Sequence, residues 1–361
     1  MAAENCPVRF GIIGCSRLAK KVTRAILLSP ATTLHAISSA SPEEAKQFAV
    51  ANELPETVRI CSSHEEVVDD PDVDAVFVPV PVGQHSRWGV AVAEKKKHLL
   101  MEKPGAVDLG ELDKVLEACE RNGVQFMDAT MWLHHPRTGK MKELISDPKL
   151  VGNIGLIHTT STAFIPRQFF ETAVPAGKPA METMGAVGEL GWYGIGAVLW
   201  AKDFHLPSSV TALPDITKSS TGVILSCSAQ LHYEQDNTVG IIHCSFLSHL
   251  TMELEIVGVN GSLYLGDFIL PYKEQSAEFN FTWMAKFVER DLGWNVKPEK
   301  VEVVNEVSQE VLMVEEFARL VQGIKAGSPP DVKWAEICRK TQLVLDSVMK
   351  SIEIGCTCVT L

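Results

Sequence analysis

Apolar residues in the first third of the chain form short continuous runs that alternate with segments of helical periodicity. The runs indicate buried strands at residues 8–13, 34–38, 74–78, 98–101 and 124–127, with helices at 19–28, 42–52, 85–94 and 109–121. Strands that alternate with helices are typical of a parallel sheet with right-handed crossovers. The pattern therefore predicts an α/β fold whose first domain, residues 1–128, is a doubly wound parallel sheet.

The pattern changes after about Asp128. A helix is predicted over residues 130–146, and β-rich runs follow at 156–163, 221–233, 238–247, 252–259 and 262–268. The pair Asn260-Gly261 between the last two runs favours a hairpin closed by a type I′ turn.

Residues 129–361 are thus expected to form a second α/β domain with a large open, mainly antiparallel sheet. Its segment 166–184 is rich in Pro, Ala and Gly and predicts a loop. Two late helices, at 309–325 and 334–351, could pack back on the first domain.

Charge and cysteine content narrow the class of partner. The 361 residues include 45 Asp and Glu against 33 Lys and Arg, a formal net charge of −12. This acidity argues against nucleic acid or an anionic membrane as the main partner, because both bind basic surfaces. We expect neither a signal peptide nor a membrane span. The nine cysteines are scattered without a Cys-x-x-Cys pair, which favours reduced thiols in the cytoplasm. We expect no metal site.

The turn after the first strand carries a glycine pattern of the dinucleotide-binding type. It reads Gly14-x-Ser16-x-x-Ala19 and opens the first helix. A helix that begins at such a turn offers free N–H groups and a positive dipole end to phosphate. An ordinary tight turn explains these residues about equally well. The candidate cofactor contacts in this turn are Gly14, Cys15, Ser16, Arg17 and Leu18.

Four residues lie just past the ends of predicted strands: Gly14, Ser39, Pro81 and Lys103. Ligands of doubly wound sheets bind at the carboxyl ends of the strands, so we expect these residues to line one crevice. Lys103 follows an apolar run and Glu102, and precedes Pro104, which fixes the corner. A lysine in a half-buried crevice can hydrogen-bond the reacting oxygen of a substrate. A plain surface lysine is the alternative.

A second candidate cluster spans residues 185–193, Gly-Ala-Val-Gly-Glu-Leu-Gly-Trp-Tyr. Its glycines allow a close backbone approach before a helix begins. Glu189 and Tyr193 are four residues apart and share a helical face. A carboxylate and a phenol that face a lysine form a proton-transfer set. The alternative is that Tyr193 and Trp192 are core aromatics.

Together these segments resemble the Gfo/Idh/MocA oxidoreductase family, and more closely its plant members and the dimeric dihydrodiol and D-xylose dehydrogenase branch. The matching elements are residues 11–14, 81–85, 102–104 and 185–193. The resemblance implies an N-terminal Rossmann domain that binds NADP(H), slightly favoured over NAD(H). It also implies a C-terminal sheet that binds substrate and forms a homodimer, and oxidation of a secondary alcohol in a sugar, polyol or dihydrodiol.

By position in the resemblance, Lys103 is the catalytic lysine and Tyr193 the acid/base tyrosine, while Glu189 orients the substrate. His85 and Glu102 join Ser39, Pro81 and Lys103 among the cofactor contacts. Substrate contacts are expected from Trp132, His134, Arg137 and Trp192.

Four residues depart from the family pattern. Ser16 replaces the second fingerprint glycine, and Ala40 stands where many NADP-using relatives carry an arginine. Val82 replaces the usual Asn or Thr, and Glu189 replaces an aspartate, which moves its carboxylate about one methylene further out. Two alternatives to a dehydrogenase therefore stay open. One is a non-catalytic member that senses the nucleotide, and the other is a redox-neutral enzyme that retains its cofactor.

Overall fold

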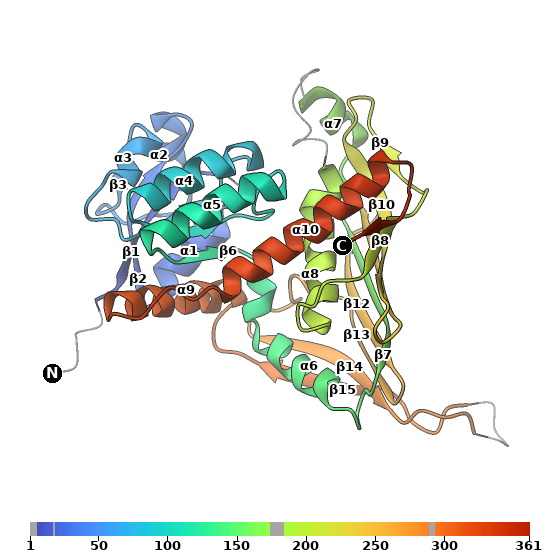
Figure 1. Cartoon of the computed structure of the whole chain (residues 1–361). Helices are drawn as coiled ribbons and strands as arrows, with labels where there is room; N and C mark the ends of the chain where they lie inside the picture. Colours follow the sequence, from blue (N-terminus) through green and yellow to red (C-terminus); the bar gives the residue numbers. More distant parts are fainter. Residues whose placement is uncertain (1–5, 17–18, 174–183, 289–292) are drawn as a thin grey trace. The chain divides into compact units, whose positions relative to one another are not determined.

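The chain divides into two compact units in the computed structural model, which describes residues 6–16, 19–173, 184–288 and 293–361 (Figure 1). The first unit comprises residues 1–134 and 307–339, and the second comprises residues 135–306 and 340–361. Helix α10 (Lys333–Glu353) begins in the first unit and ends in the second.

The first unit is built on a six-stranded sheet of order β3-β2-β1-β4-β5-β6, in which every described strand pair is parallel. The strands are β1 (Val8–Ile13), β2 (Thr32–Ser38), β3 (Arg59–Ile60), β4 (Ala75–Val78), β5 (His98–Met101) and β6 (Phe126–Asp128). The helices are α1 (Ala19–Leu28), α2 (Pro42–Ala51), α3 (His64–Val68), α4 (His85–Glu94), α5 (Leu109–Asn122) and α9 (Gln309–Lys325). The predicted doubly wound parallel sheet is confirmed, and its strand order reverses direction between β1 and β4.

Local signals in the sequence explain where these helices begin and end. Asp108 caps α5 by accepting a hydrogen bond from the Glu111 N–H at 2.8 Å, and Gly123 ends the helix with a φ of 64°. Ser41 caps α2 in the same way, through the Glu44 N–H at 3.2 Å. All residues of β4 and β5 are buried, as a sheet covered on both faces requires.

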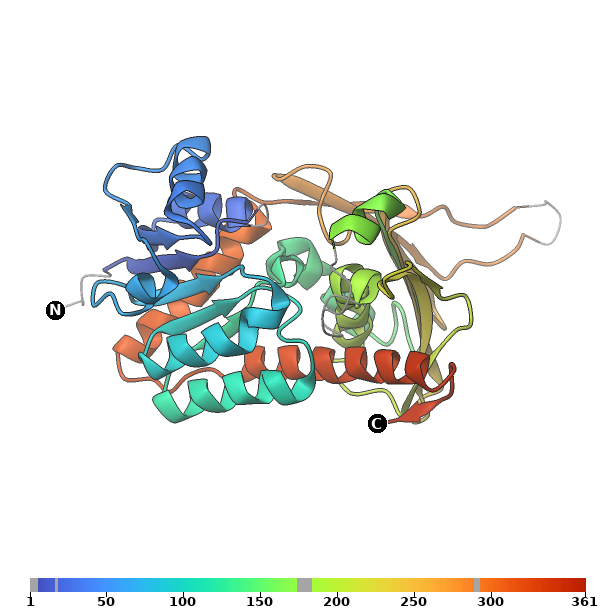
Figure 2. The same ribbon diagram turned by 90° about the horizontal axis from the view of Figure 1, so that it is seen from above.

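The second unit is built on a ten-stranded sheet of order β15-β14-β13-β12-β7-β11-β10-β8-β16, with β9 paired to β10. Its strands are β7 (Ile154–Thr162), β8 (Ser209–Ala212), β9 (Thr217–Lys218), β10 (Ile224–Tyr233), β11 (Thr238–Ser245), β12 (Thr251–Gly258), β13 (Gly261–Leu265), β14 (Ser276–Trp283), β15 (Glu299–Val304) and β16 (Val359–Thr360). Of the described pairs, β7 with β11 is parallel and the others are antiparallel. The large, mainly antiparallel sheet is therefore confirmed. Figures 1 and 2 show the helices of this unit on one side of the sheet only, among the elements that are drawn as placed.

The second unit also contains helices. They include α6 (Pro136–Ser146), α7 (Arg167–Ala173) and α8 (Trp192–Ala201). Helix α7 lies inside the segment 166–184 that was predicted to be a loop, and residues 174–183 lie outside the described residues. Within the described parts of the whole chain, every helix is too short or too polar to cross a membrane.

The helix predicted over residues 130–146 is interrupted. Met131–His134 form a short 3-10 helix, and α6 begins only at Pro136. His135 between them is extended, with φ −69° and ψ 134°. The helical conformation is disfavoured for a residue that precedes proline, because it clashes with the proline ring. His135 instead caps α6, and its Nδ1 accepts a hydrogen bond from the Arg137 N–H at 2.9 Å.

The predicted hairpin at Asn260-Gly261 is present, but its turn is not type I′. The last paired residues of β12 and β13 are Val257 and Ser262, and neither Asn260 nor Gly261 has the positive φ that a type I′ turn requires. The Asn260 N–H donates to the carbonyl oxygen of Val151 at 2.9 Å. A Cβ on Gly261 would lie 2.5 Å from a backbone oxygen in the loop before β7. Contact with this loop, rather than turn geometry, explains the Asn-Gly pair.

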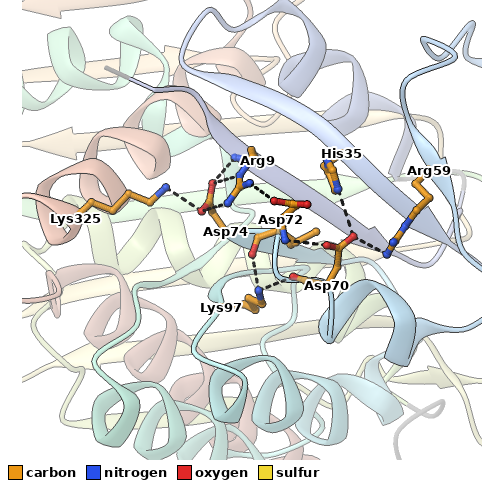
Figure 3. A network of polar contacts seen from close by, with 9 residues as sticks. Arg9, His35, Arg59, Asp70, Asp72, Asp74, Lys97 and Lys325 are labelled. Carbon is orange, nitrogen blue, oxygen red and sulfur yellow. Dashed lines mark hydrogen bonds and ion pairs between the residues drawn. The ribbon is translucent and has the colours of Figure 1, made fainter. Parts of the chain in front are cut away.

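A network of charged side chains lies at the amino ends of the strands of the first unit (Figure 3). Asp74 precedes β4 and accepts hydrogen bonds from the Arg9 N–H at 2.9 Å and the Arg9 Nε at 3.1 Å. Lys325 lies 2.9 Å from its other oxygen. Burial by itself would raise the pKa of Asp74, but the hydrogen bonds from Arg9 and Lys325 outweigh it and lower the pKa to about 2.

The second half of the same network surrounds Asp70. Its Oδ2 lies 2.5 Å from Arg59 and 3.3 Å from the His35 Nε2 (Figure 3). His35, Asp70 and Asp72 offer ligand atoms within 4.8 Å of one another, but both carboxylates already pair with arginines. The network therefore stabilises the amino edge of the sheet, whereas ligands of such sheets bind at the carboxyl edge.

Candidate active site

The turn after β1 brings two neighbouring strand ends together at the carboxyl edge of the first unit. Gly14 has a φ of 109°, a conformation that only glycine adopts without strain. Its N–H donates to the Ser38 carbonyl oxygen at 2.8 Å, and a Cβ on it would lie 3.1 Å from the Pro79 carbonyl oxygen. The ends of β1, β2 and β4 therefore meet at Gly14, where the strand order reverses.

The residues next to Gly14 prepare the start of α1. The Ser16 Oγ accepts a hydrogen bond from the Ala19 N–H at 3.3 Å, so this serine acts as a helix cap. Burial raises the pKa of the Cys15 thiol to about 11, with a hydrogen bond to Ser39 lowering it and the charge of Glu44 raising it. Cys15 is thus a neutral thiol beside these two side chains. Arg17 and Leu18, two of the predicted cofactor contacts, lie outside the described residues.

His85 joins the turn after β4 to the corner after β5. Its ring is 1% exposed. Its Nε2 lies 2.9 Å from the Val80 carbonyl oxygen, and its Nδ1 lies 3.0 Å from that of Pro104 and 3.3 Å from that of Gly105. Whichever nitrogen carries a proton therefore faces a backbone acceptor. The geometry makes His85 a positioning residue for the corner that contains Lys103.

The Glu102-Lys103-Pro104 corner is held from several sides. The Glu102 carboxylate accepts a hydrogen bond from the Lys103 N–H at 2.9 Å, and the Lys103–Pro104 peptide bond is cis. A Cβ on Gly105 would lie 2.7 Å from the Cys338 Sγ, so the corner packs tightly against α10. Lys103 is only 7% exposed, which excludes the alternative of a plain surface lysine.

The glycine cluster of the second unit forms a rare local structure. Gly185 has a φ of 49°, and a Cβ there would lie 2.1 Å from the Ile224 carbonyl oxygen, so the predicted close approach is confirmed. Residues Val187–Gly191 form a π-helix that leads into α8. Single π-turns are uncommon and occur frequently at functional sites. Glu189 is exposed on this turn, and Tyr193 is half-buried in the first turn of α8.

Lys103 belongs to the first unit, whereas Glu189 and Tyr193 belong to the second. Their convergence on one substrate remains a prediction of the sequence.

Three of the four predicted substrate contacts are enclosed by protein. Trp132 is 0% exposed and Trp192 is 1% exposed. Arg137 is 1% exposed, and its guanidinium donates to the Asp267 Oδ1 at 2.6 Å and to the Asp267 carbonyl oxygen at 2.9 Å. Asp267 thus holds the Arg137 guanidinium, and contact of these three residues with a substrate stays a prediction of the sequence.

His134, the fourth predicted contact, is half-buried and stacks on Trp334 with ring centroids 4.5 Å apart. Burial and the nearby Lys333 lower its pKa to about 3, so the ring is neutral at physiological pH. It remains the one candidate of the four that is not fully enclosed.

Glu44 was not among the site residues predicted from the sequence. The Ser39 Oγ donates a hydrogen bond to the Glu44 Oε2 at 3.0 Å, directly after the end of β2. The signal that could have found it is its position, three residues after the Ser41 cap, which places a carboxylate in the first turn of α2.

Comparison with known proteins agrees with this architecture. Residues 8–130 match the Gfo/Idh/MocA family, an oxidoreductase family with an NAD-binding Rossmann fold. D-xylose 1-dehydrogenase (NADP(+)) 2 of Haloferax volcanii is 36% identical over 138 residues, which cover 38% of this chain and 41% of that protein. Trans-1,2-dihydrobenzene-1,2-diol dehydrogenase of Danio rerio is 26% identical over 71% of this chain and 73% of that protein. The crystal structure of KijD10, a 3-ketoreductase from Actinomadura kijaniata in complex with NADP, has a TM-score of 0.76 at 20% identity over 95% of this chain and 97% of that one.

Proposed function

The chain belongs to the Gfo/Idh/MocA oxidoreductase family, and we propose that it transfers a hydride between a nicotinamide cofactor and a secondary alcohol or ketone of a sugar-like molecule. The observation that carries the proposal is the buried Lys103, held by Glu102 and His85 at the carboxyl edge of a Rossmann sheet. Ligands of such sheets bind at this edge, so a lysine enclosed there can contact a reacting substrate, which a lysine in a purely structural position cannot do.

The residues at this edge fit a dinucleotide. Gly14 leaves space where a Cβ would stand, and Ser16 opens α1, whose N-terminus favours a pyrophosphate. Pro81 begins the turn before α4, on the same edge. When bound, the cofactor supplies the carbon that accepts or returns the hydride.

In the proposed reaction, the alcohol proton passes to the Tyr193 oxygen as the hydride leaves the substrate carbon. The Lys103 ammonium stabilises the negative charge on the phenolate and hydrogen-bonds the substrate oxygen. Glu189 accepts a hydrogen bond from a neighbouring hydroxyl and orients the ring. In the reductive direction the same proton returns to the carbonyl oxygen.

The substrate class is a sugar, polyol or dihydrodiol. The relatives support this choice, since their names refer to D-xylose, to a dihydrobenzenediol and to a 3-ketoreductase. The names that mention NADP support NADP(H), the cofactor slightly favoured by the resemblance. The side chains that follow β2 support NAD(H) instead.

The test is a screen of D-xylose, other aldoses, cyclic polyols and trans-dihydrobenzenediol with NAD⁺ and NADP⁺. Turnover is measured by the absorbance of the reduced nicotinamide. We expect turnover of at least one compound with a free secondary hydroxyl. Cofactor binding without any turnover would instead favour a nucleotide-sensing protein. Nucleotide released from freshly purified, denatured protein, again without net oxidation, would favour a redox-neutral enzyme.

We further propose a cytoplasmic protein that needs neither nucleic acid nor a membrane. All nine cysteines are free thiols, as a reducing compartment requires. The acidic net charge of −12 does not favour polyanionic partners.

We also propose a homodimer formed through the side of the second sheet that carries no helix in Figure 1. Thr159 and Ile242 are buried on the side that α8 covers, so their neighbours in β7 and β11 point to the opposite side. These neighbours continue into one cross-strand row: Ile241, His158, Glu255 and Tyr264. A broad open face of this kind suits pairing with a second copy.

Light scattering at micromolar concentration is expected to give the mass of a dimer. Ile241→Glu should yield a monomer, because the new charge would be buried without a partner. The control is Val50→Glu, which adds the same charge at an exposed site on α2 and should remain dimeric. A monomeric wild type would contradict the proposal.

A further inference from the structure

The carboxylate of Glu44 stands where the second strand of the Rossmann sheet ends. Ser39 is the first residue after β2, and its Oγ donates to the Glu44 Oε2 at 3.0 Å. The backbone of Glu44 is fixed as well, because its N–H donates to the Ser41 Oγ at 3.2 Å. Glu44 is an exposed side chain, and these two hydrogen bonds place it beside the end of β2.

This position matters because of what a dinucleotide places there. In Rossmann sheets the adenosine ribose lies against the end of the second strand. An acidic residue at this point accepts hydrogen bonds from the ribose hydroxyls of NAD, whereas NADP needs a cation for its 2′-phosphate. The charge of Glu44 also contributes to the raised pKa of the Cys15 thiol, in the turn after β1.

We propose that Glu44 makes this protein selective for NAD(H) over NADP(H). The inference rests on the proposed function, and it reverses the preference expected from the resemblance. Glu44 takes the place of the acidic residue that usually ends the second strand, although it belongs to the first turn of α2. Ser39 is its positioning residue, because the serine hydroxyl directs the carboxylate toward the strand end.

Electrostatics supports the choice. Residues 38–45, Ser-Ser-Ala-Ser-Pro-Glu-Glu-Ala, contain two carboxylates and no lysine or arginine. A 2′-phosphate placed beside Glu44 would meet a like charge, and neither Ala40 nor Ser41 carries a charge to offset it. A hydroxyl in the same place can donate to the carboxylate instead.

Among the described residues that follow β2, the N-terminus of α2 would attract a phosphate, since its first N–H groups and its dipole favour anions. Glu43 and Glu44 already occupy this first turn, and Ser41 accepts from one of its N–H groups. These two carboxylates therefore already interact with the dipole of α2, which is then less available to attract a 2′-phosphate.

The experiment is a fluorescence titration of the full-length protein with NADH and with NADPH. For the wild type we expect a Kd for NADH at least about tenfold lower than that for NADPH. Glu44→Gln should weaken the binding of NADH, strengthen the binding of NADPH and bring the two Kd values within about threefold of each other. The ratio of the two Kd values in Ser39→Ala should lie between the ratios of the wild type and of Glu44→Gln, because the carboxylate stays but loses the hydroxyl that holds it.

The matched control is Glu43→Gln. It removes one negative charge from the same turn of α2, and Glu43 is an exposed side chain. We expect it to change the ratio of the two Kd values much less than Glu44→Gln does, because the Ser39 hydroxyl directs the Glu44 carboxylate, and not that of Glu43, to the strand end. Higher salt should narrow the ratio of the Kd values more in the wild type than in Glu44→Gln, since it screens the repulsion between the Glu44 carboxylate and the 2′-phosphate.

The outcomes separate this inference from the function on which it rests. A wild type that binds NADPH as tightly as NADH, or more tightly, overturns the selectivity and leaves the dehydrogenase proposal standing. A Glu43→Gln variant that changes the ratio as much as Glu44→Gln overturns the assignment to Glu44. A wild type that binds neither nucleotide overturns the proposed function and this inference with it.

Discussion

Lys103→Met is expected to lower kcat by about 10³-fold on whichever substrate the screen identifies, while the Kd of the dinucleotide changes by less than about threefold. Lys103 is 7% exposed, and methionine has a similar length and suits an enclosed site. The variant should therefore fold and keep the cofactor. It lacks the ammonium to which the proposed reaction assigns stabilisation of the Tyr193 phenolate and contact with the substrate oxygen. Steady-state kinetics together with a cofactor titration measures both quantities.

Two further variants show whether the effect comes from the charge at this site. Lys103→Arg keeps a cation there but not the geometry of an ammonium, and it should recover part of kcat. Lys114→Met removes a lysine that is 62% exposed on α5, and it should turn over like the wild type. If Lys103→Met retained full turnover, the catalytic assignment would be wrong. If it also lost the cofactor, Lys103 would be a binding residue.

Asp74→Asn is expected to lower the free energy of unfolding of the first unit by about 2 kcal/mol near neutral pH. The Asp74 side chain is 13% exposed and pairs with Arg9 and Lys325, so the substitution removes the anion that these two cations share, although Arg9 keeps its ion pair with Asp72. Urea denaturation followed by tryptophan fluorescence measures the difference.

The pH dependence of this difference has a definite sign. The pKa of Asp74 is about 2 in the folded protein, against an ordinary value of 3.8 for an aspartate. A carboxylate whose pKa is lowered by folding stabilises the protein fully above the unfolded pKa, and the contribution is lost as the pH falls toward 2. The difference between wild type and Asp74→Asn should therefore be constant above about pH 5 and shrink below pH 4.

Asp72→Asn is the matched control. Asp72 also pairs with Arg9, at 2.7 Å, but its side chain is 63% exposed. Exposed ion pairs contribute little, so we expect a change below about 1 kcal/mol. Equal effects of the two substitutions, or a loss in Asp74→Asn that grows in acid, would contradict the electrostatic account of this edge.

The sequence by itself determined the fold class and most of the elements. Continuous apolar runs predict strands that are buried on both faces, and β5 and α4 have the predicted bounds. The Glu102-Lys103-Pro104 corner was identifiable because three unusual residues follow a buried strand. Short-range signals of this kind depend on neighbours along the chain, so they can be read without coordinates.

The failures came from contacts between distant residues. Asn260-Gly261 has the composition of a type I′ turn, but packing against the loop before β7 gives it another shape. Arg137 has the chemistry of a substrate contact, yet Asp267, far away in the sequence, binds its guanidinium. Neither the loop before β7 nor Asp267 can be predicted as a partner from the residues nearby in the sequence.

The same reasoning explains the candidate site. The sequence placed Gly14, Ser39, Pro81 and Lys103 past strand ends, because chain order implies which ends share an edge. Only the tertiary structure showed that His85 ties this edge together through three carbonyl groups. It also showed that Glu44, a helix residue by pattern, presents its charge at the end of β2. Periodicity determines which residues form an element, but the direction of one side chain depends on partners that only the folded chain brings within reach.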